Sequence, residues 1–367
     1  MPCPLSLPTP HLIYWDIDMI LILSQSAMEP TTEEVMDWLE AKGARCLRLN
    51  GEDFDGAATL RLRLDGGKVG LGVFADAANA GDTVELPLAE VGAVWYRRWM
   101  NEKRHEQASL LAESGPEQAK LHYDLRRHLN QELRRLSDFV FSRFAAVPWL
   151  SHPKTASLTK LDVLTRAAQV GLDTPATLVT TKRAELSRFA AAHHGRVITK
   201  PIGEVDLFLD GERTHFLFTT ALDAAAIAAL PERFAPSLFQ EQLVKTYELR
   251  VFYLAGACHT MAIFSQADPR TRDDFRHYNR ERPNRTVPYR LAAETVTRLT
   301  RLMADLDLET GSIDLLQTAD GREVFLEVNP VGQFGMVSKP CNYHLERQVA
   351  ELLIAKEAHG RRAQKPL

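Results

Sequence analysis

A β-hairpin predicted near the end of the chain places two carboxylates face to face. Two apolar segments flank Asp320-Gly321, a dipeptide that favours a two-residue turn because both positions tolerate a positive φ. If Ala319 faces Arg322 across this turn, alternation of side chains along the strands sets Asp314 directly opposite Glu327. Opposed residues on one face have Cβ atoms only about 5 Å apart, so two negative charges there are destabilising unless a cation compensates them.

The same hairpin supplies a third oxygen donor. Asn329 lies two residues beyond Glu327 and therefore on the same face of its strand. Asp314, Glu327 and Asn329 form an oxygen-only set that suits Mg²⁺ and leaves coordination positions for water and phosphate. The alternative from this pairing alone is a solvated edge hairpin whose acids are neutralised by lysines.

Length and composition predict an ordinary soluble protein of two or three domains. The 367 residues exceed the roughly 150 of one typical domain. A net charge of -4 gives no basic excess, which argues against nucleic acid as a main partner. No apolar run approaches the roughly 20 residues that span a bilayer, so no membrane association is expected. The four cysteines lack CxxC spacing, which indicates neither a zinc site nor a disulfide framework and fits a reducing cytoplasm.

The N-terminal part reads as a small parallel α/β domain. A buried strand is predicted at 19–23, a helix opens at the capping box that begins at Thr31, and a second strand follows at 45–49. A later strand at 93–97 belongs to the same unit. No GxGxxG follows the first strand, so the dinucleotide-binding fingerprint is absent.

Polar segments and one long helix separate this domain from the rest. Residues 1–18 predict a flexible extension, or a start codon misassigned upstream of Met19, and residues 101–118 predict a surface connection. Apolar residues then recur every three or four positions over 121–144, which predicts a long amphipathic helix. That helix packs on its own domain or forms a coiled coil with a partner. Beyond it, residues 176–219 predict an α+β unit with mostly antiparallel strands.

Further residues have the chemistry to bind a nucleotide. Lys200 ends a buried strand, where an anion would offset the cost of burying its ammonium group; a structural carboxylate or plain solvation is the alternative. Residues 239–243 form a strand or hinge against which an apolar base could lie. Glu248 and Arg250 share one face of a strand, so they form a ribose acceptor beside a phosphate-binding guanidinium, or a structural ion pair.

The segment 268–290 is dense in arginine and lacks periodicity. Guanidinium groups bind phosphate and carboxylate in two-point geometry, so a mobile basic loop here suits closure over anionic reactants. A merely solvated loop is the alternative.

The order and approximate spacing of these residues resemble the ATP-grasp superfamily, from about Met19 to Leu353. The residues that carry the resemblance are Lys160, Lys200, Gln240-Glu241, Glu248, Arg250, Asp314 and the segment 325–330. Residues 94–98 (VWYRR) and 274–279 (DFRHYN) are most similar to the peptide maturases of ribosomally made graspetides, which include the microviridin-type ligases. Residues 328–335 and 340–342 resemble the grasp-with-spasm subgroup, whose members are encoded beside a SPASM-domain protein.

The resemblance implies an ATP-grasp fold of mixed α/β and α+β class, with ATP between the last two domains. The expected units are a flexible extension (1–18), a pre-ATP-grasp α/β domain (19–118), a central domain with the lid (119–236), a C-terminal catalytic domain (237–360) and a tail (361–367). Only Gly203 follows Lys200 closely, where many ATP-grasp enzymes have a longer glycine-rich loop, so the shape of the lid is left open.

Carried over residue by residue, the resemblance also implies a role for each site residue. Lys160 and Lys200 would bind the phosphates of ATP, and Glu241, Gln242 and Leu243 would contact adenine. Glu248 would bind ribose, and Mg²⁺ would be held by Asp314, Glu327 and Asn329. We expect the acyl phosphate described next to be stabilised by arginines, namely Arg250, Arg276 and Arg285.

The implied activity is an ATP-dependent ligase for carboxylate side chains of a ribosomal precursor peptide. A carboxylate attacks the γ-phosphate, and a hydroxyl or a lysine amine captures the acyl phosphate as an ester or an amide. The precursor's leader, a SPASM-domain protein and a second copy of the chain are the implied partners. No protein nucleophile is needed, so the cysteines are interpreted as incidental and Cys341 as structural. The alternatives are a glutamate-adding amino-acid ligase and a nucleotide-binding regulatory module without turnover.

Overall fold

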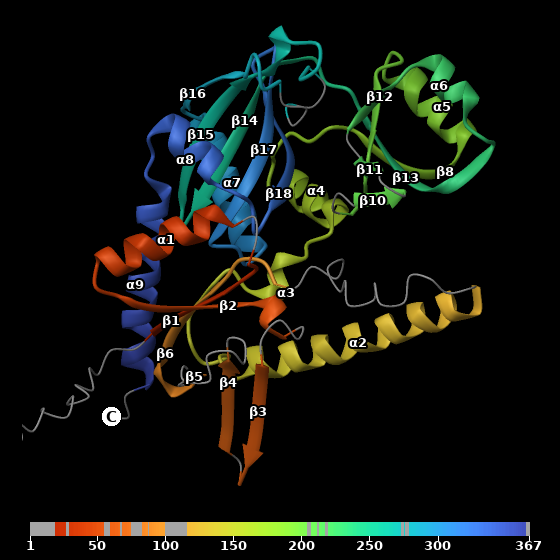
Figure 1. Ribbon diagram of the computed structural model, residues 1–367. Coiled ribbons are helices and arrows are strands. Elements are labelled where there is room, and N and C mark those ends of the chain that lie inside the picture. The colour runs from red at the N-terminus through yellow and green to blue at the C-terminus, as the bar shows by residue number, and fades with distance from the viewer. Residues whose placement is uncertain are drawn as a thin grey trace, which may run out of the picture.

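The computed structural model describes residues 19–26, 29–54, 59–66, 68–74, 83–86, 88–99, 116–203, 207–210, 213–216, 219–272, 275 and 279–364. Within these ranges, helices and five sheets give a mixed α/β and α+β fold, as the sequence predicted (Figure 1). The predicted extension at 1–18, most of the predicted connection at 101–118 and Arg276 lie outside the described residues.

The N-terminal sheet is parallel and has the order β2-β1-β6-β7. Its strands are β2 (Arg45–Asn50), β1 (Met19–Ser24), β6 (Val91–Tyr96) and β7 (Trp149–Leu150). Every residue of β1 is buried, which is why its sequence is a continuous apolar run rather than an alternating one. Helix α1 (Pro30–Ala41) connects β1 to β2, so the predicted βαβ unit is confirmed.

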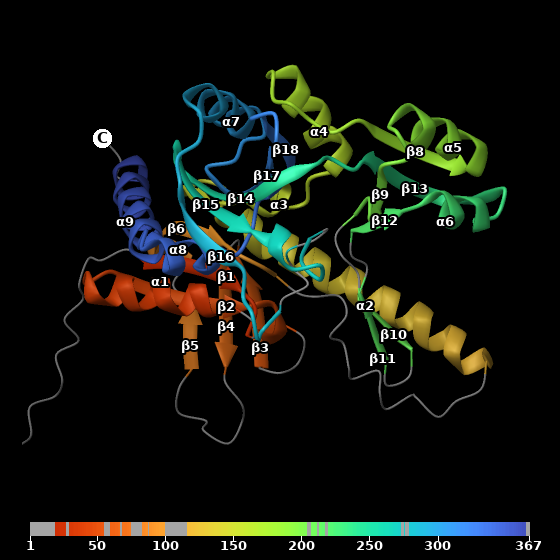
Figure 2. The ribbon, with the colours of Figure 1, turned by 90° about the horizontal axis from the view of Figure 1, so that it is seen from above.

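Helix α2 (Pro116–Ser142) is the long amphipathic helix that the sequence predicted. Its C-terminal half packs on the N-terminal sheet through Val140, while Leu121, Leu125 and Leu129 in the other half are exposed. This half extends away from the N-terminal sheet (Figure 2). A separate antiparallel sheet is formed by β3 (Thr59–Asp65), β4 (Lys68–Phe74) and β5 (Thr83–Leu86).

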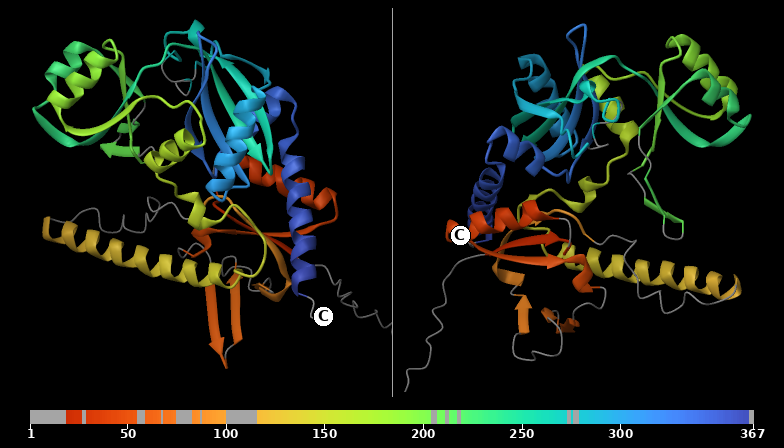
Figure 3. Two further views of the ribbon diagram at one scale, coloured as in Figure 1. Left: turned by 180° about the vertical axis from the view of Figure 1, so that it is seen from behind. Right: turned by 45° about the horizontal axis from the view of Figure 1, so that its top comes forward.

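The lid is a four-stranded antiparallel sheet of order β12-β9-β13-β8, backed by two helices. The elements are β8 (Thr177–Lys182), α5 (Arg183–Ala192), β9 (Val197–Lys200), β12 (Thr220–Leu222), α6 (Ala224–Ala229) and β13 (Arg233–Glu241). A hairpin of β10 (Leu207–Asp210) and β11 (Arg213–Phe216) extends from it. The predicted antiparallel character of this region is confirmed, and the lid stands apart from the N-terminal sheet (Figure 3).

The C-terminal sheet is antiparallel and has the order β16-β15-β14-β17-β18. Its strands are β14 (Lys245–Leu254), β15 (Ala257–Phe264), β16 (Arg285–Tyr289), β17 (Thr310–Thr318) and β18 (Glu323–Asn329). Helices α4 (Lys160–Gln169) and α7 (Ala293–Asp305) pack on one face through the core around Val251. On the other face, Phe252 packs into a core shared with α1, α8 (Gly335–Cys341) and α9 (Leu345–Gln364).

Helix α9 runs from the C-terminal sheet onto the N-terminal sheet (Figure 1). Near its end a Cβ atom on Gly360 would lie 2.2 Å from the carbonyl oxygen of Gly92, so only glycine allows this approach. The predicted domain boundaries stay predictions. We note that β7, which follows α2, lies in the same sheet as β1.

Candidate active site

A cavity of about 320 Å³ lies between the lid and the C-terminal sheet. This volume is within the range of about 300–1,000 Å³ typical of small-molecule sites. The sequence-predicted residues that line it are Lys160, Lys200, Glu241, Gln242, Leu243, Glu248, Asp314 and Glu327. Arg250, Arg285 and Asn329 are not among the lining residues, and Arg276 lies outside the described ranges.

Asp314 pairs with Glu327 across β17 and β18, as the sequence predicted, but the turn was predicted wrongly. The Thr318 N–H donates to the Arg322 carbonyl at 3.0 Å, so the loop has three residues and ends at Gly321, with φ of +88°. With Thr318 rather than Ala319 opposite Arg322, a regular ladder would place Leu326, not Glu327, opposite Asp314. A β-bulge restores the predicted pairing, because Leu315 pairs with Phe325 while Asp314 pairs with Glu327.

The bulge also changes which side chains face the cavity. Leu326 is the extra residue, and both Leu326 and Glu327 line the cavity although they are neighbours in sequence. Strict alternation would have turned Leu326 into the opposite face of the sheet. The bulge therefore brings an apolar wall and a carboxylate to one side.

Each of the two opposed carboxylates has a cation beside it. Arg250 Nη1 donates to both oxygens of Asp314, at 2.7 and 2.6 Å. Lys160 Nζ lies 3.5 Å from Glu327 Oε2 and donates to the Pro201 carbonyl at 3.3 Å. The repulsion that the sequence predicted is thus compensated within the chain, and a bound metal would take over this compensation.

The third predicted metal donor, Asn329, lies at the end of β18. Its Oδ1 accepts a hydrogen bond from the Val331 N–H at 3.0 Å and, as a carbonyl oxygen, has a second lone pair. Two opposed carboxylates followed by an amide fit a hard cation such as Mg²⁺. Among the described residues, no group of three or more His, Cys, Asp or Glu side chains is placed to hold a metal.

The hinge between the lid and the C-terminal sheet forms one wall of the cavity. β13 ends at Glu241 and β14 begins at Lys245, so the predicted segment 239–243 is strand up to Glu241 and hinge beyond it. The Gln242 N–H donates to the Arg196 carbonyl at 3.0 Å, and Glu241 Oε1 accepts from the Ala176 N–H at 2.9 Å. These bonds tie the hinge to the lid. Apolar lining that the sequence reasoning missed comes from Ile198, Val244, Leu316 and Leu326.

Glu248 is buried at the edge of the cavity, with 8% of its surface exposed. Lys245 Nζ at 2.6 Å and Ser265 Oγ at 2.8 Å both donate to its Oε1. Burial raises the pKa of Glu248, and the neighbouring Lys245 opposes that shift. The pair with Lys245 was not anticipated from the sequence, although a lysine three residues earlier was a visible signal.

The arginines are divided between the cavity and its surroundings. Arg250 is largely buried against Asp314, and its Nε is buried without a hydrogen-bond partner in the described structure. Arg285 is exposed and its guanidinium lies 5.2 Å from the centre of the Phe264 ring. Arg272, from the arginine-rich segment, lines the cavity and was not singled out from the sequence.

The arrangement of a parallel N-terminal sheet, an antiparallel lid and an antiparallel C-terminal sheet, with a cavity between the last two, is that of the ATP-grasp fold, as the similar solved structures below show. Residues 19–152 match the family model of the MvdD pre-ATP grasp domain. In the described part of the chain, no helix has the length and hydrophobicity needed to cross a membrane.

Solved structures share this fold over nearly the whole chain. Macrocyclase MdnC from Microcystis aeruginosa MRC, bound with precursor peptide MdnA, matches with a TM-score of 0.75 at 24% identity, covering 92% of this chain and 99% of that one. The RiPP-associated ATP-grasp ligase of Chryseobacterium gregarium, in complex with ADP and a leader and core peptide, matches with a TM-score of 0.77 at 20% identity. The match covers 93% of this chain and 97% of that one. ATP-grasp ligase PsnB, complexed with minimal precursor, Mg and ADP, matches with a TM-score of 0.67 at 20% identity. The match covers 92% of this chain and 97% of that one. Among curated proteins, no relative matches the sequence.

Proposed function

We propose that this protein is an ATP-dependent ligase that activates Asp or Glu side chains of a ribosomal precursor peptide. The observation that carries the proposal is the convergence of two lysines and two opposed carboxylates on one cavity beside the hinge. Similar solved proteins bind precursor peptides, ADP and Mg, which supports the choice of substrate and cofactors.

The chain's own groups suit each part of ATP. The apolar walls at Ile198, Leu316 and Leu326 would hold adenine against the hinge residues Glu241, Gln242 and Leu243. Glu248 Oε2 takes neither of the bonds from Lys245 and Ser265, which suits a ribose hydroxyl. Lys160 and Lys200 would bind the phosphates.

Binding would exchange the ion pairs described above. Mg²⁺ would be held by Asp314, Glu327 and Asn329 and would supply charge neutralisation between the phosphates. Lys160 and Arg250 would then turn from the carboxylates to the phosphates and the acyl phosphate. Phosphoryl transfer needs mainly placement and charge neutralisation, which these groups supply.

The proposed chemistry has two steps. A substrate carboxylate oxygen attacks the γ-phosphorus, the bond to the bridging oxygen breaks, and ADP leaves. A hydroxyl or an amine then attacks the acyl carbon, loses its proton and expels phosphate, giving an ester or an amide. Arg276 and Arg285 stay predictions for stabilising the acyl phosphate, and Arg272 is added because it lines the cavity.

Finer assignments are also proposed. Residues 328–335 and 340–342 support membership of the grasp-with-spasm subgroup and hence a SPASM-domain partner. A homodimer and a cytoplasmic location complete the proposal. Light scattering of the purified chain tests the dimer.

The function is tested by incubating the protein with ATP, Mg²⁺ and the peptide of a neighbouring short reading frame. We expect release of ADP and a product lighter than the peptide by one water mass for each link. A gain in mass by added glutamate would favour the amino-acid ligase, and nucleotide binding without ADP release would favour the regulatory module.

A further inference from the structure

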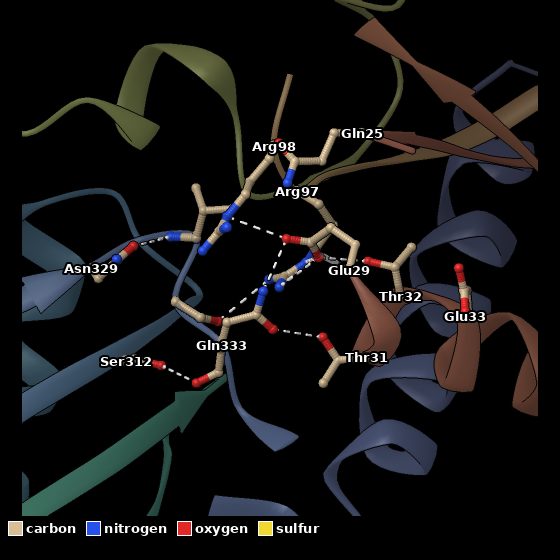
Figure 4. Close-up of polar contacts among 12 residues, drawn as sticks. Gln25, Glu29, Thr31, Thr32, Glu33, Arg97, Arg98, Ser312, Asn329 and Gln333 are labelled. Atoms are coloured by element: carbon tan, nitrogen blue, oxygen red, sulfur yellow. Dashed lines mark hydrogen bonds and ion pairs between the residues drawn. The ribbon is translucent and has the colours of Figure 1, made fainter. Parts of the chain in front are cut away.

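A largely buried polar cluster joins the N-terminal sheet to the turn that follows β18 (Figure 4). We call Glu29, Thr31, Arg97, Arg98 and Gln333 the junction cluster. The Glu29 side chain has no exposed surface, and it accepts from Arg97 Nη2 at 3.2 Å and lies 3.2 Å from Arg98 Nε. The cluster therefore holds a carboxylate between two guanidinium groups at the carboxyl end of β6.

Arg97 is fixed within this cluster on every side. Its guanidinium lies 5.3 Å from the centre of the Trp95 ring and 5.5 Å from that of Phe334. Burial lowers the pKa of Arg97, and the Glu29 carboxylate opposes this shift. A buried ion pair is a weak source of stability. The ring contacts and the bonds to Glu29 nevertheless confine the Arg97 guanidinium to one place.

Gln333 connects Glu29 to the C-terminal sheet. Its Nε2 donates to Glu29 Oε1 at 3.1 Å, and its Oε1 accepts from Thr31 Oγ1 at 3.1 Å. Its carbonyl oxygen accepts from Ser312 Oγ in β17 at 3.1 Å. Gln333 thus bonds to both domains at once.

The packing around Gln333 leaves the turn little freedom. A Cβ on Gly332 would lie 2.3 Å from Ser312, and a Cβ on Gly335 would lie 2.8 Å from Thr31 Cγ2. The Gly332 carbonyl also accepts from Arg97 Nη1 at 3.5 Å. The turn is therefore pressed between β17 and α1.

The same turn sets the orientation of the Asn329 amide. The Val331 N–H donates to Asn329 Oδ1 at 3.0 Å, and the Gly332 N–H donates to the Asn329 carbonyl at 3.1 Å. Ser312, which bonds to Gln333, is also the strand partner of Asn329. A shift of Gln333 would consequently move the amide oxygen that follows Glu327.

We propose that Gln333 is a positioning residue for the metal site, acting through the turn at Asn329 and held in place by Glu29. This inference rests on the proposed function, which assigns Asn329 to Mg²⁺. Groups that orient metal ligands typically change metal affinity by about 10- to 100-fold when they are removed. The N-terminal domain would in this way contribute to the metal site without touching it.

The test is the variant Gln333→Ala, which removes the side-chain bonds to Glu29 and Thr31 and leaves the pair of Glu29 with Arg97 in place. Calorimetry with ADP at increasing Mg²⁺ should show half-saturation at about tenfold higher Mg²⁺. Nucleotide affinity at saturating Mg²⁺ should be unchanged. The control Gln348→Ala breaks a similar bond, from Nε2 to the Tyr343 carbonyl at 2.7 Å, and should leave the Mg²⁺ dependence unchanged.

The outcomes separate this inference from the proposed function. Wild-type protein without Mg²⁺-dependent ADP binding would contradict the proposed function itself. Normal wild-type binding together with an unaltered Gln333→Ala variant would overturn only the positioning role. If Gln333→Ala fails to fold, the variant Thr31→Val serves as the test, because it removes the hydroxyl that donates to Gln333 Oε1. This variant should shift the Mg²⁺ dependence in the same direction by a smaller factor. The absence of a shift would overturn the inference.

Discussion

The substitution Asp314→Asn separates a structural ion pair from a metal ligand. Asp314 is 19% exposed and Arg250 12% exposed, so the pair between them is largely shielded from water. Removing one partner of a buried pair costs about 3–5 kcal/mol, but asparagine keeps one oxygen for Arg250, which reduces the expected loss of unfolding free energy to about 1–3 kcal/mol. Urea unfolding measures this term.

The effect on activity should be larger than the effect on stability. Loss of one preorganised charge at a phosphoryl-transfer site should lower kcat by about 10²–10³-fold, judged by the cost of removing comparable electrostatic groups. Precursor-dependent ADP release measures it, and calorimetry with ADP should show weaker Mg²⁺ dependence. The fold should be retained at 25 °C.

A matched control is Asp138→Asn on α2. Asp138 is 59% exposed and lies 3.7 Å from Arg135, so this change breaks an exposed Asp–Arg pair worth at most about 1 kcal/mol. Both activity and Mg²⁺ dependence should stay at the wild-type level. If Asp314→Asn loses stability but releases ADP at the wild-type rate, Asp314 is only the partner of Arg250 and the metal assignment is refuted.

Three further predictions concern the cavity and the cysteines. Leu326→Ala should raise KM for ATP about 5- to 30-fold with kcat retained, because about 1–2 kcal/mol of apolar contact is lost; the exposed Leu64→Ala is the control, and initial rates measure both. The raised pKa of Glu248 means that its contribution to stability is present below the ordinary value of 4.5 and is lost as pH rises through the higher folded-state pKa. The unfolding free energy of wild type minus that of Glu248→Gln should therefore fall as the pH rises above 4.5, and a difference that stays constant with pH in urea unfolding would contradict this sign. Burial raises the pKa of Cys258 to about 11 and also raises those of Cys46 and Cys341, so iodoacetamide near neutral pH should leave these thiols unmodified by mass spectrometry and ADP release unchanged; loss of activity on alkylation would indicate a protein nucleophile.

Local patterns in the sequence were sufficient for most elements of the fold. The amphipathic helix predicted from the apolar repeat over 121–144 is present as α2, since a repeat of three or four residues is a local signal. Asp314 was also predicted correctly to lie opposite Glu327, but only because two unforeseen features, the longer turn and the bulge, compensate each other. The longer turn and the bulge at Leu326 each shift the register by one residue, and neither has a clear signal in the sequence.

Contacts between distant segments could not be predicted in the same way. Arg97 and Arg98 were noticed only as part of a family motif. Arg97 bonds to Glu29 from a position 68 residues away in the sequence, a contact that exists only once the N-terminal sheet and helix α1 have packed. Arg285 was expected near the acyl phosphate, and the structure places its guanidinium against the Phe264 ring, a rotamer choice that no pattern reveals. The prediction of the site was thus limited by the directions of side chains more than by the positions of strands.

The position of α9 has a consequence for how the chain folds during synthesis. Ile20 and Ile22 of β1 are buried in a core that includes Leu345, Val349 and Leu353 of α9. On a ribosome, β1 would emerge roughly 300 residues before this cover, which at about 5–20 residues per second leaves one side of the first sheet exposed for tens of seconds. Nascent chains that stall before α9 should therefore be the ones that chaperones bind and proteases cleave.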